Sequence, residues 1–322
     1  MMNKLFFVAW LALMLTGCSS SPKTKDVEKS ETFRFVFLTD IHLRPEFGAI
    51  EGFQMAIDKV NALAPDFVIT GGDLVWDVNG ATYQRADSLY KLYNEMSEGF
   101  EMPVYNTMGN HELYGLRPIP DTGHAEYGEK MFENRIGKRF YSFDHGGWHF
   151  LILDGNEKGD DEPGSIIGKV DDTQLEWISN DLENVDPQTP IVVVIHIPLV
   201  SVYSQIRFGS LYAENQGSLV SNSGQVLALF EEMNLKLVLQ GHLHIVEEIN
   251  LMNRVRFING GSVCGLWWIT PENSDFQEGF VMIEASEDDF TWEYVDYGWE
   301  TGMPPRDIRW PLVGSVDWEL LE

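Results

Sequence analysis

The sequence contains only two cysteines, Cys18 and Cys264, so the 322 residues hold no framework of disulfides. Basic residues are also scarce, because 22 Lys and Arg stand against 50 Asp and Glu and the formal net charge is -28. This charge argues against a nucleic-acid partner, since neutralising phosphates requires clustered Lys and Arg. It also repels free anionic substrates, so a site for phosphate groups would need local positive charge, such as bound cations.

The sequence also lacks an N-terminal hydrophobic run long enough to span a bilayer. The apolar run at residues 5 to 15 falls short of the ~20 residues that spanning requires, and it follows Lys4 as in a secretory signal peptide. Leu15-Thr16-Gly17-Cys18 resembles the lipobox of bacterial lipoproteins, in which the cysteine is lipidated and becomes the mature N-terminus. This resemblance predicts anchoring in the cell envelope, at the outer membrane or facing the periplasm. The alternatives are an ordinary signal peptide with an accidental cysteine, or a short uncleaved anchor.

The rest of the chain divides by composition. Residues 19 to 31 are polar without an apolar period, which predicts a flexible tether after a signal peptide at residues 1 to 18. Residues 32 to 297 show neither a repeat nor a linker and are expected to form one domain. Residues 298 to 322 are expected to be an irregular tail packed on that domain through Trp299, Trp310 and Trp318. If Cys18 carries a lipid, Cys264 is expected to be a small buried hydrophobe rather than a nucleophile.

Hydrophobic periodicity predicts a domain of the α/β class. Helical periods cover residues 52 to 63, 83 to 96, 126 to 136, 172 to 182 and 225 to 233, with Asp172 as the N-cap of the fourth helix. Strand patterns cover residues 33 to 39, 66 to 70, 103 to 108, 139 to 143, 148 to 153, 190 to 195, 235 to 239, 254 to 258, 279 to 284 and 290 to 294. Helices and buried strands alternate early and strands dominate later, which favours sheets sandwiched between helices.

Polar side chains with metal-ligand chemistry follow the predicted strands. In open α/β sheets ligands bind beyond the carboxyl ends of strands, so we expect these side chains to converge. Oxygen and imidazole ligands without thiolate suit Mn, Fe, Zn or Ni better than Ca or Mg. Seven candidates are too many for one four-coordinate ion, and two divalent transition-metal ions (Mn, Fe or Zn) sharing a bridging carboxylate would use them all. The candidates are Asp40, His42, Asp73, Asn110, His196, His242 and His244.

These residues form an ordered set of short motifs. Asp40-x-His42, Gly72-Asp73, Gly109-Asn110-His111-Glu112, His196 and Gly241-His242-x-His244 together resemble the calcineurin-like metallophosphoesterase superfamily, over residues 33 to 285. That superfamily includes purple acid phosphatases and class III cyclic-nucleotide phosphodiesterases. The resemblance implies a four-layer α/β/β/α sandwich. It also implies one metal held by Asp40, His42, Asp73 and His244, and a second held by Asp73, Asn110, His196 and His242.

The resemblance further implies roles in the GNHE motif at residues 109 to 112. His111 would protonate the leaving group, whereas Glu112 has less support and would only orient a neighbour. Purple acid phosphatases carry a Tyr a few residues after the Gly-Asp pair, but this chain has Leu74-Val75-Trp76, which argues against a purple Fe(III) centre. The expected reaction is hydrolysis of a phosphate mono- or diester by a hydroxide that bridges the metals.

Two other functions stay open on the sequence alone. The chain could be a cyclic-nucleotide phosphodiesterase, which shares these motifs, or a non-catalytic surface lipoprotein that binds sugar phosphates or a partner. Arg207 is a candidate phosphate contact. His124, His145 and His149 belong to no motif and are interpreted as structural, and Asp77 and Asp154 as turn formers. Aromatic residues that would line a substrate pocket, or only pack, are Tyr203, Phe208, Tyr212, Trp267 and Trp268.

Overall fold

The computed structural model describes residues 32–159, 162–270 and 276–300. Its helices are α1 (Ala49–Leu63), α2 (Tyr83–Ser97), the 3-10 helix η1 (Asn110–Glu112), α3 (Lys130–Arg135), α4 (Asp172–Leu182), α5 (Tyr203–Phe208) and α6 (Ser223–Ala228). Its strands are β1 (Phe33–Leu38), β2 (Phe67–Thr70), β3 (Val104–Tyr105), β4 (Tyr141–His145), β5 (Trp148–Leu153), β6 (Asn156–Lys158), β7 (Ile166–Gly168), β8 (Pro190–Ile195), β9 (Asn234–Gln240), β10 (Val246–Leu251), β11 (Val255–Gly260), β12 (Phe280–Ala285) and β13 (Phe290–Val295).

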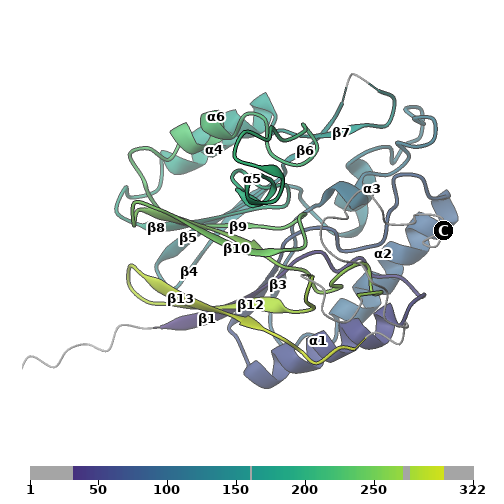
Figure 1. The fold of residues 1–322 in the computed structure, drawn as a ribbon, viewed down its shortest axis with the longest axis horizontal. Coiled ribbons are helices and arrows are strands. Elements are labelled where there is room, and N and C mark those ends of the chain that lie inside the picture. Colours follow the sequence, from purple (N-terminus) through teal and green to yellow (C-terminus); the bar gives the residue numbers. More distant parts are fainter. Residues whose placement is uncertain (1–31, 160–161, 271–275, 301–322) are drawn as a thin grey trace, which may run out of the picture. The chain divides into compact units, whose positions relative to one another are not determined.

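The strands form two large sheets and one small hairpin. One sheet has the order β13-β12-β1-β2-β3 and the other the order β10-β11-β9-β8-β5-β4, while β6 pairs with β7. The strands β1, β2 and β3 run parallel, as do β5, β8 and β9. Helices α1 and α2 cover the five-stranded sheet, and α4 and α6 cover the six-stranded sheet (Figure 1). This arrangement confirms the predicted four-layer α/β/β/α sandwich.

Strand alternation explains how the layers are held together. In β1, Phe35 and Phe37 face the second sheet, whereas Val36 and Leu38 face α1, because successive side chains point to opposite faces of a sheet. The space between the sheets is filled by aromatic rings. Phe67 stacks on Phe35 with ring centroids 5.1 Å apart and meets Phe150 edge-on at 5.5 Å. Both geometries are favourable for aromatic pairs, so this interior fixes the two sheets against each other.

Several predicted boundaries need correction. The α4 helix is capped by Asp171 rather than Asp172, because the Asp171 carboxylate accepts the backbone N–H of Gln174 at 2.7 Å. Helix α3 begins four residues later than predicted, and α6 ends at Ala228 instead of residue 233. Five further elements, η1, β6, β7, α5 and β10, were not predicted from the periodicity. No helix among the described residues combines the length and apolarity needed to cross a membrane.

Asp77, Asp154 and His149 have contacts that agree with their interpretation as turn formers or structural residues. Asp77 and Asp154 accept the backbone N–H two residues later, as turn formers do. His149 lies between two carboxylates, with Nδ1 2.7 Å from Asp144 and Nε2 2.8 Å from Asp181. In the tail, Trp299 packs on Trp268. Residues 301 to 322 of the predicted tail, the tether and Cys18 lie outside the described residues.

Candidate metal centre

The seven candidate ligands come from loops at the carboxyl ends of parallel strands in both sheets. Asp40 and His42 follow β1, Asp73 follows β2 and Asn110 opens η1 after β3. On the other sheet His196 follows β8 directly, and His242 and His244 follow β9. Backbone hydrogen bonds join the loops of the first sheet, since the N–H of His42 donates to the Asp73 carbonyl at 2.8 Å. The structure therefore brings all seven predicted residues to one edge of the sandwich.

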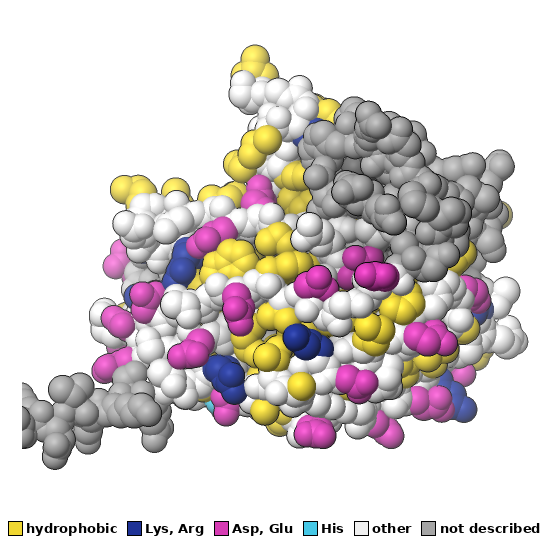
Figure 2. Space-filling model, turned by 60° about the horizontal axis from the view of Figure 1, so that its bottom comes forward, with side chains coloured by type: hydrophobic (Ala, Val, Ile, Leu, Met, Phe, Trp, Pro, Cys, Tyr) yellow, Lys and Arg dark blue, Asp and Glu magenta, His cyan; other side chains and the backbone are white. Residues whose placement is uncertain are grey.

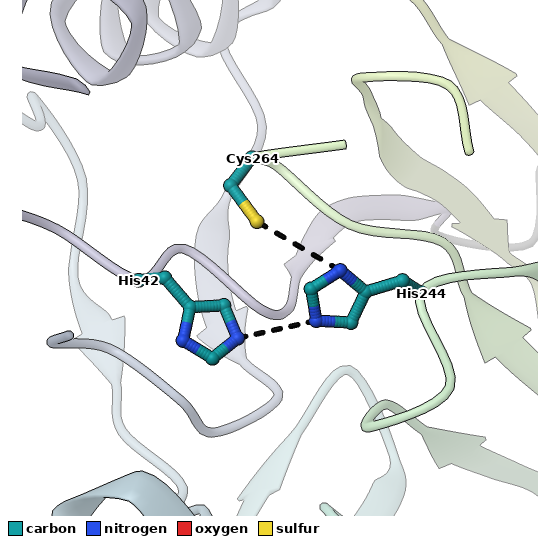
Figure 3. Close-up of side chains that lie close together, drawn as sticks. All are labelled: His42, His244 and Cys264. Atoms are coloured by element: carbon teal, nitrogen blue, oxygen red, sulfur yellow. Dashed lines mark hydrogen bonds between the residues drawn. The ribbon is translucent and has the colours of Figure 1, made fainter. Parts of the chain in front are cut away.

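The first group of side chains surrounds Asp40. The Nε2 atom of His244 lies 3.1 Å from Oδ1 of Asp40 and 3.1 Å from Nε2 of His42. The Nε2 atom of His42 also lies 3.4 Å from Oδ2 of Asp73. Cys264 contacts the opposite side of the His244 ring, because its Sγ lies 3.8 Å from Nδ1 (Figure 3). The thiol is buried as predicted and does not share the face of the ring that Asp40 approaches.

The second group shares Asp73 with the first. The Nε2 atom of His196 lies 3.2 Å from Oδ2 of Asp73 and 3.0 Å from Oδ1 of Asn110. Ligand atoms of Asp73, His196 and His242 all lie within 4.8 Å of one another. The geometry thus gives Asp73 the central position between two sets of side chains.

Hydrogen bonds on the far side of two imidazoles orient them. His196 donates from Nδ1 to the Gly71 carbonyl at 2.7 Å, and His244 donates from Nδ1 to the Gly265 carbonyl at 2.7 Å. In the neutral form of each ring this fixes the tautomer in which Nε2 carries the lone pair and faces the carboxylates, as metal-ligating histidines are commonly held. The donor set of carboxylate, amide oxygen and imidazole therefore fits divalent transition-metal ions.

The pKa values of the site follow from burial and from the central carboxylates. Burial raises the pKa of Asp73, but the imidazoles of His196, His111 and His42 together outweigh this and hold the pKa below its usual value. Conversely, burial opposes protonation of His196, but Asp73 raises its pKa to about 9. Burial lowers the pKa of His42 to about 3 and, together with His196, that of His242 to about 4. The buried carboxylates thus favour positive charge beside them, and His42 and His242 are neutral near pH 7, as ligation requires.

Five of the seven candidate ligands have a left-handed backbone. Their φ angles are positive although none of them is glycine, and such conformations cost about 1 to 3 kcal/mol each and cluster at functional sites. Close packing adds a second constraint at Gly109, where a Cβ atom would lie 2.2 Å from the Asp73 backbone N. Position 109 therefore has no room for a side chain. The five residues are Asp40, His42, Asp73, His242 and His244.

His111 lies beside the shared carboxylate, and its ligand atom lies within 4.8 Å of those of His42 and Asp73. Its backbone N–H donates to Oδ1 of Asp73 at 3.0 Å, and its Nε2 lies 3.9 Å from Oδ2. The side chain keeps 17% of its surface exposed, unlike the fully buried His42 and His196. It is therefore placed where a side chain can meet both solvent and a group bound at Asp73.

Trp267 and Trp76 border the same site. The Trp267 ring lies 4.2 Å from the His42 ring, 4.8 Å from the His244 ring and 5.5 Å from the His111 ring, measured between centroids. Trp267 is half-buried, and Trp76 meets it edge-on at 5.3 Å. Trp268 is instead fully buried in the core and donates its indole N–H to the Ile41 carbonyl at 2.9 Å. Trp267 therefore keeps exposed surface at the site, whereas its sequence neighbour Trp268 does not.

Arg207 lies on α5 and is half-buried, with its guanidinium 5.6 Å from the ring centroid of Phe208. Its role as a phosphate contact stays a prediction. From the sequence, Glu112 was assigned only a weak orienting role, and no role was predicted for Arg44. Arg44 is buried and sandwiched between the rings of Phe47 at 4.2 Å and Trp76 at 4.0 Å. No local pattern signals that contact, because it depends on the folded positions of the two rings.

Comparison with known proteins defines the class. A family model described as calcineurin-like phosphoesterase matches residues 33–246, and a model of the prokaryotic membrane lipoprotein lipid attachment site matches residues 2–19. The chain therefore belongs to the calcineurin-like phosphoesterase family. The lipid attachment site indicates a lipid-anchored protein of the cell envelope.

Individual proteins that resemble this chain share only low sequence identity with it. A probable cyclic nucleotide phosphodiesterase of Moraxella catarrhalis (strain BBH18) is 26% identical over 186 residues, which are 55% of this chain and 61% of the relative. Another, from Psychrobacter sp. (strain PRwf-1), is 24% identical over 56% of this chain and 46% of its own length. The chain thus matches about half of these relatives' length. A dimetal phosphatase of Danio rerio has the same fold, with a TM-score of 0.59 and 14% identity over 83% of this chain and 96% of that one.

Proposed function

We propose that the chain is a dinuclear metal-dependent hydrolase of phosphate mono- or diesters. The observation that carries the proposal is the central position of Asp73, whose Oδ2 lies 3.4 Å from His42 and 3.2 Å from His196. A carboxylate flanked in this way by two ligand groups suits a bridge between two cations. Two divalent cations in the site would lower the pKa of a water molecule and neutralise charge on the phosphoryl oxygens.

The side chains of the protein have separable tasks in this proposal. Asp40, His42 and His244 hold one cation and Asn110, His196 and His242 the other, with Asp73 shared. His111 stands outside both groups and donates a proton to the departing oxygen, which is a contribution of typically 10²–10⁴-fold. The half-buried Trp267 shields one side of the imidazoles from water. The positive charge of the two cations would also offset the repulsion between a phosphate ester and a chain of net charge -28.

The test combines metal analysis with hydrolysis. Purified protein loaded with Mn, Zn or Fe is expected to hydrolyse an aryl phosphate mono- or diester, and Asp73→Asn and His242→Ala are expected to lose both bound metal and turnover. Asparagine tolerates the left-handed backbone of position 73, so this change removes charge with little strain. Asp288→Asn, at an exposed residue after β12, is the matched control. Full activity of metal-depleted protein would contradict the proposal.

Cyclic-nucleotide hydrolysis is the second candidate function. It is favoured by the relatives from Moraxella catarrhalis and Psychrobacter sp., both of which are named probable cyclic nucleotide phosphodiesterases. The aromatic surface of Trp267 beside His111 supports it, because nucleobases stack on aromatic side chains. A comparison of kcat/KM for 3',5'-cyclic AMP, bis-p-nitrophenyl phosphate and p-nitrophenyl phosphate separates the two candidates. A clear preference for the cyclic nucleotide would replace the broader assignment.

A further inference from the structure

The segment of residues 202 to 212 gathers exposed apolar side chains. Of the eleven large hydrophobic side chains that the described residues expose, five lie in these eleven positions. Leu211 is 96% exposed and Ile206 80% exposed. Scattered apolar residues are normal on protein surfaces, but a cluster of this kind marks an interaction site. We call this surface the apolar segment; its exposed members are Val202, Ile206, Phe208, Leu211 and Tyr212.

Local hydrogen bonds give the apolar segment a defined shape. Within α5 the N–H of Ile206 donates to the Val202 carbonyl at 3.0 Å. The Gln205 side chain then donates to the Tyr212 carbonyl at 3.1 Å, and the rings of Phe208 and Tyr212 lie 4.8 Å apart. The turn is therefore closed by its own polar groups, while the aliphatic side chains of α5 and the following loop stay outside.

Hydrogen bonds hold the residues that precede the apolar segment beside the metal centre. The side chain of Gln240, at the end of β9, accepts the backbone N–H groups of Leu199 at 2.8 Å and Val200 at 3.2 Å and donates to the Val200 carbonyl at 3.0 Å. The same strand end continues into His242 and His244. The segment itself begins six residues after His196. It therefore belongs to the edge of the sandwich that carries the candidate ligands.

Charge distinguishes this surface from the rest of the chain. The acid-rich sequence contains no Asp or Glu from residue 197 to residue 213, and the one charged residue there is Arg207. Acidic side chains are spread over the face shown in Figure 2, with few basic ones among them. In the fold, Glu247 of β10 lies at the start of the segment, where its carboxylate accepts the backbone N–H of Val202 at 3.0 Å. An anionic lipid surface would repel the acidic faces, whereas a segment without acidic residues of its own can approach it.

We propose that the apolar segment docks onto the lipid bilayer to which the chain is anchored and holds the metal centre at the membrane surface. The lipid attachment site ends near Cys18, and thirteen residues separate Cys18 from the first described residue. A chain of that length spans at most roughly 45 Å, so the domain stays within reach of the bilayer. Aliphatic side chains mixed with Phe and Tyr suit the interfacial layer of a membrane. The inference concerns docking and does not depend on the proposed reaction.

The test uses the lipidated full chain in vesicles of phosphatidylethanolamine and phosphatidylglycerol. An environment-sensitive fluorophore is attached at Leu211→Cys, because Cys264 is buried and Cys18 carries the lipid. Met252→Cys, at a residue 90% exposed between β10 and β11, is the matched control. Docking predicts a blue shift of the Leu211 label and its quenching by lipids that carry a quencher, with neither change at Met252.

A second label position tests whether the aliphatic side chains cause the docking. A label at Ser210→Cys is expected to be quenched by the lipid in the native background and to lose most of this quenching when Ile206 and Leu211 are both replaced by serine. Hydrolysis of a soluble aryl phosphate by the double variant should be unchanged. Equal emission of the Leu211 and Met252 labels in vesicles would overturn the proposal. So would a blue shift at Leu211 that grows with protein concentration in vesicle-free detergent solution, which would indicate contact between copies.

Discussion

The carboxylate of Glu112 accepts the backbone N–H of Asp73 with a distance of 2.9 Å between Oε2 and N. The same oxygen accepts the N–H of Gly109 at 2.7 Å, and Oε1 accepts the N–H of Val75 at 3.1 Å. One fully buried side chain thus ties the loop after β2 to the GNHE turn. Burial, reinforced by the charge of Asp73, raises the pKa of this carboxyl to about 8. Glu112 therefore positions the central carboxylate through its backbone.

Replacement of Glu112 by Gln should weaken the metal centre without unfolding the protein. The new amide N–H would face backbone N–H groups, so a hydrogen bond that holds Asp73 is lost. Residues that support metal ligands typically change metal affinity or activity by about 10- to 100-fold. The metal affinity measured by titration and the kcat should each fall by about this factor. Glu101→Gln, on the surface, is the control. An unchanged metal affinity would limit Glu112 to a structural role.

Removal of bound metal should lower thermal stability. A ligand that binds only the native state stabilises it by about 2.7 kcal/mol at a concentration 100 times its Kd. Chelation should therefore lower the Tm, and addition of Mn or Zn should restore it. His242→Ala should show a smaller metal-dependent shift in Tm than the native chain. Equal shifts in the two proteins would mean that the metal binds elsewhere.

Substitution of His111 by Ala should affect substrates unequally. A proton donor matters most for a basic leaving group, so the loss in kcat should approach 10²–10⁴-fold for an alkyl phosphate ester. It should be much smaller for p-nitrophenyl phosphate, whose leaving group needs no proton. Metal content should stay at the native level, since the proposal assigns His111 to neither ligand group. A uniform loss across leaving groups would speak against proton donation.

Gly109→Ala should be one of the most damaging small substitutions. The added methyl group would lie 2.2 Å from the backbone N and from Oδ1 of Asp73, so the loop has to move. Overpacking of this kind costs about 1 to 3 kcal/mol, and here it also displaces the central carboxylate. Gly224→Ala on α6 is the control, because nothing lies within 4 Å of its added methyl group. Urea unfolding and metal content should separate the two variants.

Trp267→Leu should change substrate preference. Base stacking on an aromatic side chain contributes about 1 to 3 kcal/mol, so kcat/KM for a nucleotide ester should fall by about 5- to 150-fold. An alkyl phosphate ester should be affected less. Trp177→Leu, on α4 against Phe140, provides a matched control. Equal losses for both substrates would assign Trp267 to packing alone.

The sequence predicted the elements that have a buried face. Strand β8, which is buried throughout, and helix α1, with its apolar stripe, were found at nearly their observed bounds. Strand β10 was missed because it is an edge strand with exposed positions, and its Glu247 and Glu248 break any apolar alternation. Helix α5 was missed because none of its residues is buried, so periodicity carries no signal there.

The residues of the metal centre were likewise predictable as a set, since each follows a strand. Their backbone conformation was not, because left-handed angles at Asp40, His42 or Asp73 are imposed by neighbouring loops rather than by residue type. The same holds for Glu112, whose partners Asp73 and Val75 are distant in the sequence. Long-range contacts of this kind have no local signature. The role of each ligand and the domain boundary near residue 297 stay predictions.

The aromatic interior between the sheets has a consequence for the chemistry at their edge. The loops of one sheet carry Asp40, Asp73 and Asn110, whereas the loops of the other carry His196, His242 and His244. The thickness of the ring layer built around Phe35, Phe67 and Phe150 therefore sets how far apart the two halves of the site lie. A change of ring size in this layer would alter the spacing between the ligands without touching any of them. Variants with altered turnover are thus to be expected deep in the sandwich, remote from substrate.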